Sequence, residues 1–236
     1  MAARDGGVVG AAQYDAFVDD FGYAAISPEW VFSNAAGSTD TALTVWNHTA
    51  GVSIANVITT AAAADVSTLT TRRTFKPPLL LTAVVKCTLG HADSRAYMEL
   101  VSEDGLDILS AALKQSTTNF VVGYGMTVNA VAATEVFASN TYGKTTLRRL
   151  RMLWTESLVE VTTETLGASW DGWAIEKQIE YNLPAFHKAY KLRFRSLARD
   201  ANAAAMTVER VAVQEFHNVI VPAPAATGEA LASVIA

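Results

Sequence analysis

Strict alternation of apolar side chains in residues 72–101 constrains the fold of this chain more than any other feature. Six residues share one side of an extended segment and three share one side of the next: Leu79, Leu81, Ala83, Val85, Cys87 and Leu89, then Ala96, Met98 and Leu100. The connecting residues 90–94 include Gly, Asp and Ser, which favour turns. Pro77 and Pro78 donate no backbone hydrogen bond and therefore belong before the first strand. The pattern predicts two neighbouring strands that form a central β-hairpin.

The same two-residue period recurs along the chain. Residues 148–154, 173–181 and 190–195 alternate apolar with charged or polar side chains. Shorter β-rich segments lie at 14–32, 43–58, 66–75, 106–113, 120–136 and 206–216, and turn residues separate them. Gly123 and Gly125 indicate a bulge or a close backbone approach, and the step from Val208 to Val211 indicates a bulge. About a dozen short strands without a long helix are typical of an all-β, antiparallel β-sandwich or jelly roll.

Both ends of the chain differ in composition from the centre. Residues 1–13 and 222–236 are rich in Gly, Ala and Pro and carry too little large apolar surface to fold alone. We therefore expect one sandwich domain at 14–221, with extended N- and C-terminal arms at 1–13 and 222–236.

Charge and hydropathy exclude several classes of protein. Half of the residues are hydrophobic, yet no apolar run is long enough for a spanning helix, so no membrane partner is expected. The net charge of −5 argues against general attraction to nucleic acid. Cys87 is the only cysteine and reads as a small buried hydrophobe. The first residues contain no secretory signal, so synthesis in a reducing cytoplasm is expected.

Motifs for catalysis and cofactor binding are lacking. No serine lies in a Gly-x-Ser-x-Gly elbow, and four histidines lie on separate segments: His48, His91, His187 and His217. Gly123-Tyr124-Gly125 lacks the third glycine and the helix of a phosphate-binding loop. Residues 103–107 indicate a turn more than a calcium loop. The sequence therefore predicts no catalytic residue, no metal site and no cofactor.

Two pairs of glutamates are candidates for glycoside hydrolysis, which needs carboxylates that face each other across a cleft. Glu160 and Glu164 are four residues apart, as are Glu176 and Glu180, so each pair shares one face of a strand. Solvated strand faces explain both pairs more simply.

Trp170, Asp171 and Trp173 form the most distinctive local motif. Two indoles that flank an Asp-Gly turn can stack on a sugar ring while the carboxylate accepts its hydroxyl groups. The alternative is that Trp173 begins a strand with its ring in the core and that Trp170 covers the end of this strand.

Basic residues suggest a docking strip. Arg148, Arg149 and Arg151 share one predicted strand, and Lys188, Lys191, Arg193 and Arg195 share another. If these strands pair, they form a strip that can bind an acidic neighbour. The alternative is that Glu160, Glu176 and Glu180 balance the strip across the sheet.

Several segments taken together resemble concanavalin A-like jelly rolls of the laminarinase or LamG type, over about residues 17–221. They are the Phe17-Val18-Asp19-Asp20-Phe21 start with Pro28-Glu29-Trp30, the Arg73-x-Phe75-x-Pro77 segment, Tyr97-Met98-Glu99-Leu100, and the run from Val208 to Val213. Related glucanases carry Glu-x-Asp-x-Glu on one strand, which this sequence lacks. The resemblance therefore implies the fold without a hydrolase activity, and domains of this type recur among bacteriophage virion proteins.

The resulting hypothesis is a non-enzymatic, accessory structural protein of a bacteriophage virion, associated with the capsid or the tail. It would be made in the host cytoplasm and would bind other virion proteins through its arms, in several copies. The alternative is a carbohydrate-binding module that recognises a host-surface glycan through Trp170, Asp171 and Trp173. A polysaccharide hydrolase is the third and weakest alternative.

Overall fold

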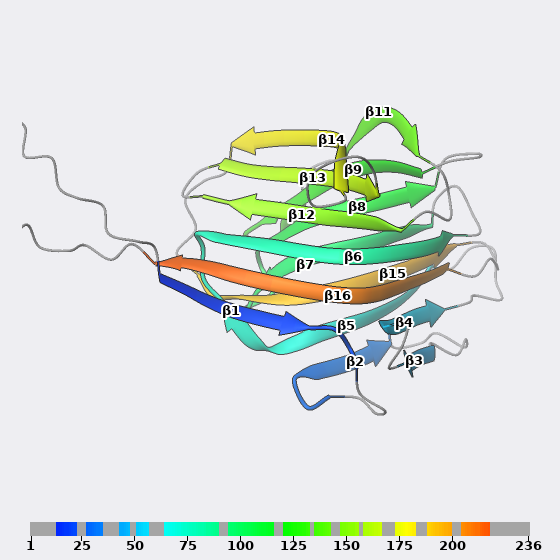
Figure 1. Cartoon of the computed structure of the whole chain (residues 1–236), viewed down its shortest axis with the longest axis horizontal. Coiled ribbons are helices and arrows are strands. Elements are labelled where there is room, and N and C mark those ends of the chain that lie inside the picture. The colour runs from blue at the N-terminus through cyan, green and yellow to red at the C-terminus, as the bar shows by residue number, and fades with distance from the viewer. Residues whose placement is uncertain are drawn as a thin grey trace, which may run out of the picture.

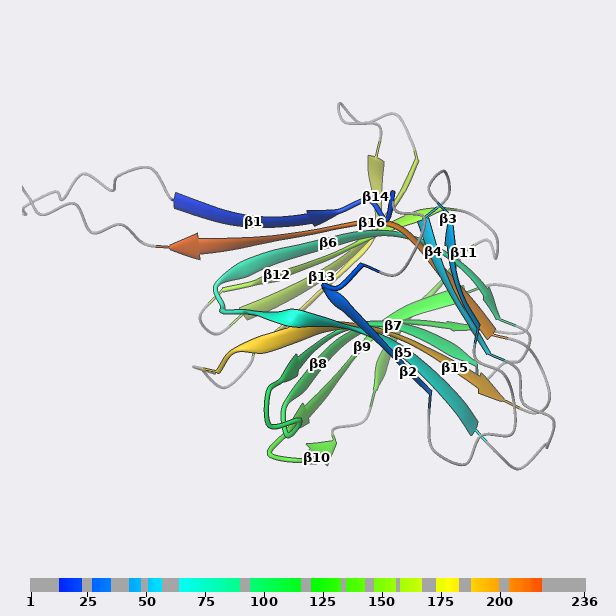
Figure 2. The same ribbon diagram turned by 90° about the horizontal axis from the view of Figure 1, so that it is seen from below.

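The computed structural model contains two stacked β-sheets (Figure 2). It describes residues 13–22, 27–34, 43–47, 51–56, 64–89, 94–115, 120–132, 135–142, 147–155, 158–166, 173–182, 188–199 and 204–217. Only the backbone is described for residues 13–16, 34, 43–47, 51–56, 64, 65, 115, 120, 136, 138–142, 166, 173–182, 199 and 217. The predicted arms lie outside these residues, except that Gln13 begins the first strand.

Sheet A is antiparallel, with eight strands among the described residues. Across the sheet these are β14 (Trp173–Asn182), β13 (Leu158–Leu166), β12 (Arg148–Trp154), β6 (Leu79–Leu89), β16 (Ala204–His217), β4 (Gly51–Asn56) and β3 (Leu43–Asn47), with β1 (Gln13–Asp19) also paired to β16. The register of β16 against β6 shifts between Val208 and Arg210, which confirms the predicted bulge.

Sheet B is also antiparallel and has eight strands in the described part of the chain. Across the sheet these are β10 (Val131–Ala132), β9 (Phe120–Val128), β8 (Ile108–Gln115), β7 (Arg95–Ser102), β15 (Tyr190–Arg199), β5 (Ala64–Phe75) and β2 (Trp30–Asn34), with β11 (Val136–Tyr142) also paired to β9. The predicted all-β jelly roll is therefore confirmed.

The core lies between the two sheets and consists of the side chains that alternation selects. On β6, the residues with odd numbers from Leu79 to Leu89 are all buried, while those between them are partly or fully exposed. Met152 and Trp154 of β12 belong to the same core cluster as Leu192 and Phe194 of β15. Full burial of one such aliphatic or aromatic side chain contributes about 1.5–3 kcal/mol.

The predicted hairpin of β6 and β7 is wrong. β6 lies in sheet A between β12 and β16, whereas β7 lies in sheet B between β15 and β8. The chain crosses from one sheet to the other after Leu89. Alternation reports which side of a strand is buried, and both strands do bury the predicted side. It does not report the neighbouring strand.

Asp19 connects the first two strands, which belong to different sheets. Its Oδ1 accepts a hydrogen bond from the Phe21 N–H at 2.7 Å, and its Oδ2 accepts one from Trp30 Nε1 at 2.8 Å. The Trp30 ring contacts the rings of Phe17, Phe21 and Phe194. This buried aromatic group explains why aromatic and acidic residues alternate at the start of the chain.

The two ends of the domain lie side by side. β1 and β16 are antiparallel neighbours, with Gln13 opposite His217, the first and last described residues (Figure 1). Segments 1–12 and 218–236 are therefore attached at the same point of sheet A. Among the described residues, no helix is long and apolar enough to cross a membrane.

Candidate binding face on sheet B

The outer face of sheet B is recessed. On β7, Met98 and Leu100 belong to the main core, so Tyr97 and Glu99 project to the opposite face. Both are nevertheless buried, at 2% and 0% exposure. A second apolar cluster forms on this side from Tyr97, Ala112 and Leu197, with Val66 and Phe137 packed against it. Phe137 of β11 thus helps to cover the centre of this face.

Glu99 is the most buried acid on this face and is neutralised by two arginines of β15. Its Oε2 lies 2.5 Å from Arg193 Nε, and its Oε1 lies 2.6 Å from a terminal guanidinium nitrogen of Arg195. The strand register places Arg193 directly opposite Glu99. A buried carboxylate with two guanidinium partners has its charge and its lone pairs satisfied.

A second acid, Glu135, is held in the same network. Its Oε1 accepts a hydrogen bond from the Tyr97 hydroxyl at 2.7 Å, and its Oε2 lies 3.2 Å from Arg95 Nε. The guanidinium of Arg195 lies 3.7 Å from the centre of the Tyr97 ring. Burial raises the pKa of the Tyr97 hydroxyl well above its ordinary value, so Tyr97 remains a donor at neutral pH.

Gly125 of β9 confirms the predicted close backbone approach. A Cβ atom at this position would lie 2.8 Å from Ser110 Oγ and 3.2 Å from Glu135 Cγ. A side chain here would force the Ser110 hydroxyl and the Glu135 side chain to shift. Glycine therefore suits this position because of the close packing beside the network.

Both carboxylates of this face are engaged in ion pairs, which limits the chemistry available. Glycoside hydrolysis needs one carboxylic acid that donates a proton and a second carboxylate that acts as base or nucleophile. Glu99 pairs with Arg193 and Arg195. Glu135 pairs with Arg95 and accepts a hydrogen bond from the Tyr97 hydroxyl. The arrangement is suited to holding β7, β15 and β11 together, and to presenting arginines at the floor of a recess.

A bulge in β5 interrupts the sheet next to this network. Lys191 of β15 is opposite Thr74 and Arg193 is opposite Thr70, so three residues of β5 face the single residue Leu192. Thr71 Oγ1 accepts a hydrogen bond from the Leu192 N–H at 3.0 Å and donates one to the Arg73 carbonyl at 2.8 Å. A side-chain hydroxyl thus substitutes for part of the backbone ladder.

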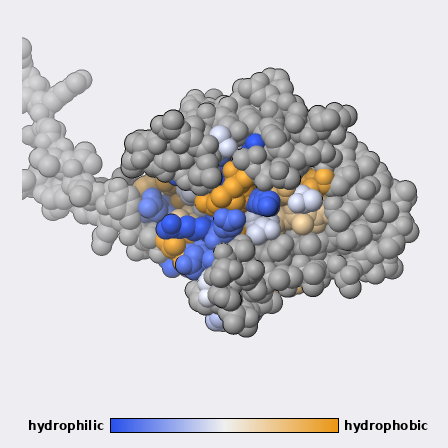
Figure 3. Space-filling model, turned by 45° about the vertical axis from the view of Figure 1, so that its right-hand side comes forward, coloured by the Kyte–Doolittle hydropathy of each residue, from blue (hydrophilic) through white to orange (hydrophobic). Residues whose placement is uncertain are grey.

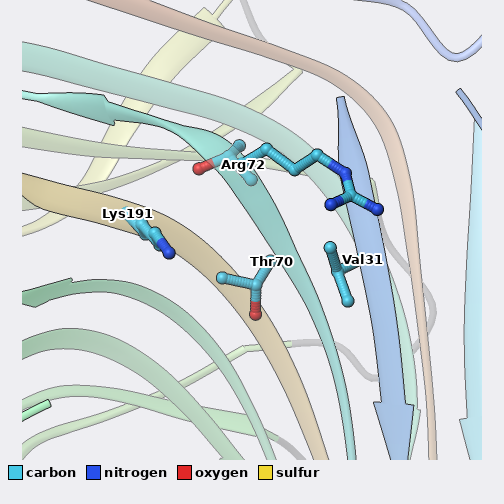
Figure 4. Close-up of a pocket in the computed structure, with 5 residues that line it drawn as sticks. Val31, Thr70, Arg72 and Lys191 are labelled. Atoms are coloured by element: carbon cyan, nitrogen blue, oxygen red, sulfur yellow. The ribbon is translucent and has the colours of Figure 1, made fainter. Parts of the chain in front are cut away.

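A cavity of about 370 Å³ lies at the bulge, on the outer face of sheet B. Its described lining residues are Val31 of β2, Thr70, Thr71 and Arg72 of β5, and Lys191 of β15 (Figure 4). The Arg72 N–H donates to the Glu29 carbonyl at 2.8 Å, which fixes the backbone at the rim. The described lining is cationic and includes no acid.

Four large hydrophobic side chains are substantially exposed on the described surface. Those with substantial exposure are Val18 of β1, Val31 of β2, Leu106 in the β7–β8 turn and Val131 of β10. In the view of Figure 3, hydrophobic and hydrophilic described residues lie next to one another. The described part of the body therefore offers no broad apolar docking area.

The predicted continuous basic strip does not form, because β12 and β15 belong to different sheets. Arg148 points inward and is buried, and Arg149 and Arg151 both pair with Glu164. Arg193 and Arg195 pair with Glu99. The described carboxylate partners of these arginines are Glu164 and Glu99, neither of which is among the predicted Glu160, Glu176 and Glu180. Lys188 pairs with Asp104 and Asp107. Of the seven predicted strip residues, only Lys191 is among the described lining residues of the cavity.

The other predicted site residues are placed only in part. Trp170 and Asp171 lie outside the described residues, and Trp173 begins β14 with its backbone opposite Leu166. The side chains of Glu176 and Glu180 are likewise outside the description. Glu164 is buried, and Glu160 accepts a hydrogen bond from Thr162 at 3.0 Å.

Sequence reasoning missed Glu99, Glu135 and Arg72 as site residues. The available signal was the Arg-x-Tyr-x-Glu spacing of residues 95–99, which places three polar side chains on one face of a predicted strand. Burial of that face depends on β11 and β15, which are distant in sequence.

Comparisons with known proteins give structural matches only. No family model matches the chain, and no curated protein matches it in sequence. The apo Crh5 transglycosylase has a TM-score of 0.59 and 16% identity, over 86% of this chain and 85% of that chain. The β-glucanase of Bacillus licheniformis has a TM-score of 0.57 and 9% identity, over 84% and 97%.

A further match is the CBM2 module of the evolved Dit of Lactobacillus casei BL23 phage J-1. Its TM-score is 0.62 at 10% identity, over 88% of this chain and 98% of that module. These likenesses define the class of the fold, a concanavalin A-like jelly-roll β-sandwich. At such identities they carry no information on activity.

Proposed function

We propose that this chain is a non-enzymatic structural module of a bacteriophage virion, which binds neighbouring virion proteins through segments 1–12 and 218–236. The pairing of Gln13 with His217 carries the proposal, because it brings both segments to one point of sheet A. Two segments from one point can contact the same neighbour. The scattered exposed hydrophobic residues support docking through these segments rather than through the body.

The energetic basis of such docking is burial of surface by segments that order on binding. A stable interface removes roughly 1,200–2,000 Å² of total surface from water. Two extended segments of low complexity can supply this area, at an entropic cost that weakens the affinity per unit area. Multiple copies on a symmetrical particle would then compensate through avidity.

A non-enzymatic role is supported by the state of the carboxylates on the recessed face. Glu99 and Glu135 are held by arginines, and the sequence nowhere contains the Glu-x-Asp-x-Glu run that the resemblance to glucanases would imply for a hydrolase. The likeness to a module of a phage Dit protein adds support for a virion location.

Truncation tests the docking proposal. Proteins lacking residues 1–12 or 222–236 should fold with the same circular dichroism spectrum and melting behaviour as the full chain, but should fail to enter particles in a complementation assay. A matched control is Lys86→Ala, an exposed change on β6 that should assemble normally. Incorporation of both truncated forms at the level of the full chain would refute the proposal.

Carbohydrate recognition is the second candidate, and the recessed face of sheet B favours it. A cavity beside a recess with aromatic and arginine side chains is a common setting for sugars. On a glycan array, loss of binding in Trp170→Ala would assign the site to the 170–173 motif. A reducing-sugar assay on β-glucans, with Glu99→Gln as control, would detect hydrolysis, which we do not expect.

A further inference from the structure

The cavity at the β5 bulge differs from the rest of the outer face of sheet B in its charge balance. Elsewhere on this face, Arg193 and Arg195 pair with Glu99, and Arg95 pairs with Glu135. Within the described part of the chain, neither Arg72 nor Lys191 forms an ion pair, and neither has an interaction with any other residue that would neutralise it. The two cations that line the cavity, Arg72 and Lys191, are therefore available to bind a ligand.

The bulge explains why these two side chains face open space. Three residues of β5 stand opposite Leu192, and Thr71 uses its hydroxyl group to satisfy the backbone groups that the bulge leaves unpaired. The sheet therefore opens locally while the Leu192 N–H and the Arg73 carbonyl keep a hydrogen-bond partner. In Figure 4, Arg72 and Lys191 lie on either side of Thr70, and the Arg72 guanidinium lies near Val31.

We propose that this cavity binds an acidic saccharide, with Arg72 and Lys191 as the residues that recognise its carboxylate, sulfate or phosphate groups. The protein as a whole is acidic, so this attraction is local. Val31 is 39% exposed and offers an apolar wall for a sugar ring, and the Thr70 hydroxyl can bond to ring substituents.

Size favours a saccharide over an acidic protein. A volume of about 370 Å³ falls in the roughly 300–1,000 Å³ range of small-molecule sites. A protein partner would need about 800 Å² of contact on each side, far beyond this cavity. The site goes beyond the proposed docking role and does not depend on it. It rests on the carbohydrate-recognition candidate only for the class of ligand.

Calorimetric titration of the full chain tests the site. The probes are a short oligogalacturonate, a sulfated galactan oligomer and sialyllactose, each with its neutral counterpart, together with inorganic phosphate and polyglutamate. We expect binding of at least one acidic saccharide, with its neutral counterpart bound at least about tenfold more weakly. The double variant Arg72→Gln/Lys191→Gln should lose at least about tenfold in affinity. Arg210→Gln, at an exposed position of β16 in sheet A, should bind as the full chain does.

Several results would overturn the site. These are unchanged affinity in the double variant, equal affinity for acidic and neutral forms, tightest binding of inorganic phosphate or polyglutamate, or no binding of any acidic saccharide. Neutral glycan binding that Trp170→Ala abolishes and the double variant retains would reject this site and leave carbohydrate recognition standing. Thermal melting of every variant separates lost binding from lost folding.

Discussion

Glu99 is the residue on which the outer face of sheet B depends most. It is 0% exposed, and both of its carboxylate oxygens bind arginines of β15. Removal of one member of a buried ion pair leaves the other charge without compensation, so we expect Glu99→Ala to lower the free energy of unfolding by about 3 kcal/mol. Urea denaturation measures the change. Lys86→Ala, at an exposed position of β6, should change the free energy of unfolding by no more than about 0.5 kcal/mol. A similarly small effect of Glu99→Ala would contradict this view of the network.

The Cys87 thiol should be inert in the folded protein. Burial raises its pKa from 9.0 to about 12, while the charge of Arg148 opposes the shift. Because the folded value lies above the unfolded value, the neutral thiol stabilises the fold fully below pH 9, and this contribution decreases as the pH rises from 9 towards 12.

At pH 8 we therefore expect an aromatic disulfide reagent to modify Cys87 only after urea unfolds the chain. Cys87 is the only thiol, so the absorbance change has a single origin. Rapid modification of the folded protein would show that the thiol is accessible.

At the scale of strands, the alternation of apolar and polar residues correctly predicted which face of each strand is buried. It did not predict correctly which strands pair with one another. The buried sides of β6, β12 and β15 all follow from the sequence, because side chains two apart share a face. The β6–β7 hairpin and the joint basic strip failed for one reason: the sheet to which a strand belongs is set by contacts with distant segments. Local turn residues between strands do not encode it.

The candidate site was harder to predict for the same reason. Arg72 and Lys191 are separated by more than a hundred positions in the chain and meet only because β5 and β15 pair. The alternating pattern did place Lys191 outward, together with Arg193 and Arg195. Which of these cations is neutralised depends on Glu99, which lies on a third strand.

The Thr71 side chain stabilises the bulge in β5. Replacement by valine keeps the shape but removes the hydroxyl that serves the Leu192 N–H and the Arg73 carbonyl. We expect Thr71→Val to cost about 1–3 kcal/mol of stability, because buried backbone groups lose their partner. Thr68→Val, on the outward side of the same strand, is the matched control. Equal midpoints of thermal unfolding for the two variants would exclude this role of the hydroxyl.

At the scale of the whole molecule, β1 marks the boundary between the segment that we propose to dock and the body that folds. The Phe17 ring lies 6.0 Å from the Trp30 ring and 5.6 Å from the Phe75 ring, measured between centroids, and it is buried in the core. Deletion of residues 1–12 leaves these contacts in place, whereas deletion of 1–19 also removes Phe17, Asp19 and a strand of sheet A.

We therefore expect the 1–12 deletion to unfold at the same denaturant concentration as the full chain and the 1–19 deletion to fail to fold. Phe17→Ala isolates the aromatic contribution and should cost about 3–5 kcal/mol, as removal of a buried phenylalanine does elsewhere. Denaturant titrations followed by tryptophan fluorescence distinguish the three proteins. A cooperative, fully stable 1–19 deletion would mean that β1 belongs to the docking segment, and the boundary would then move to β2.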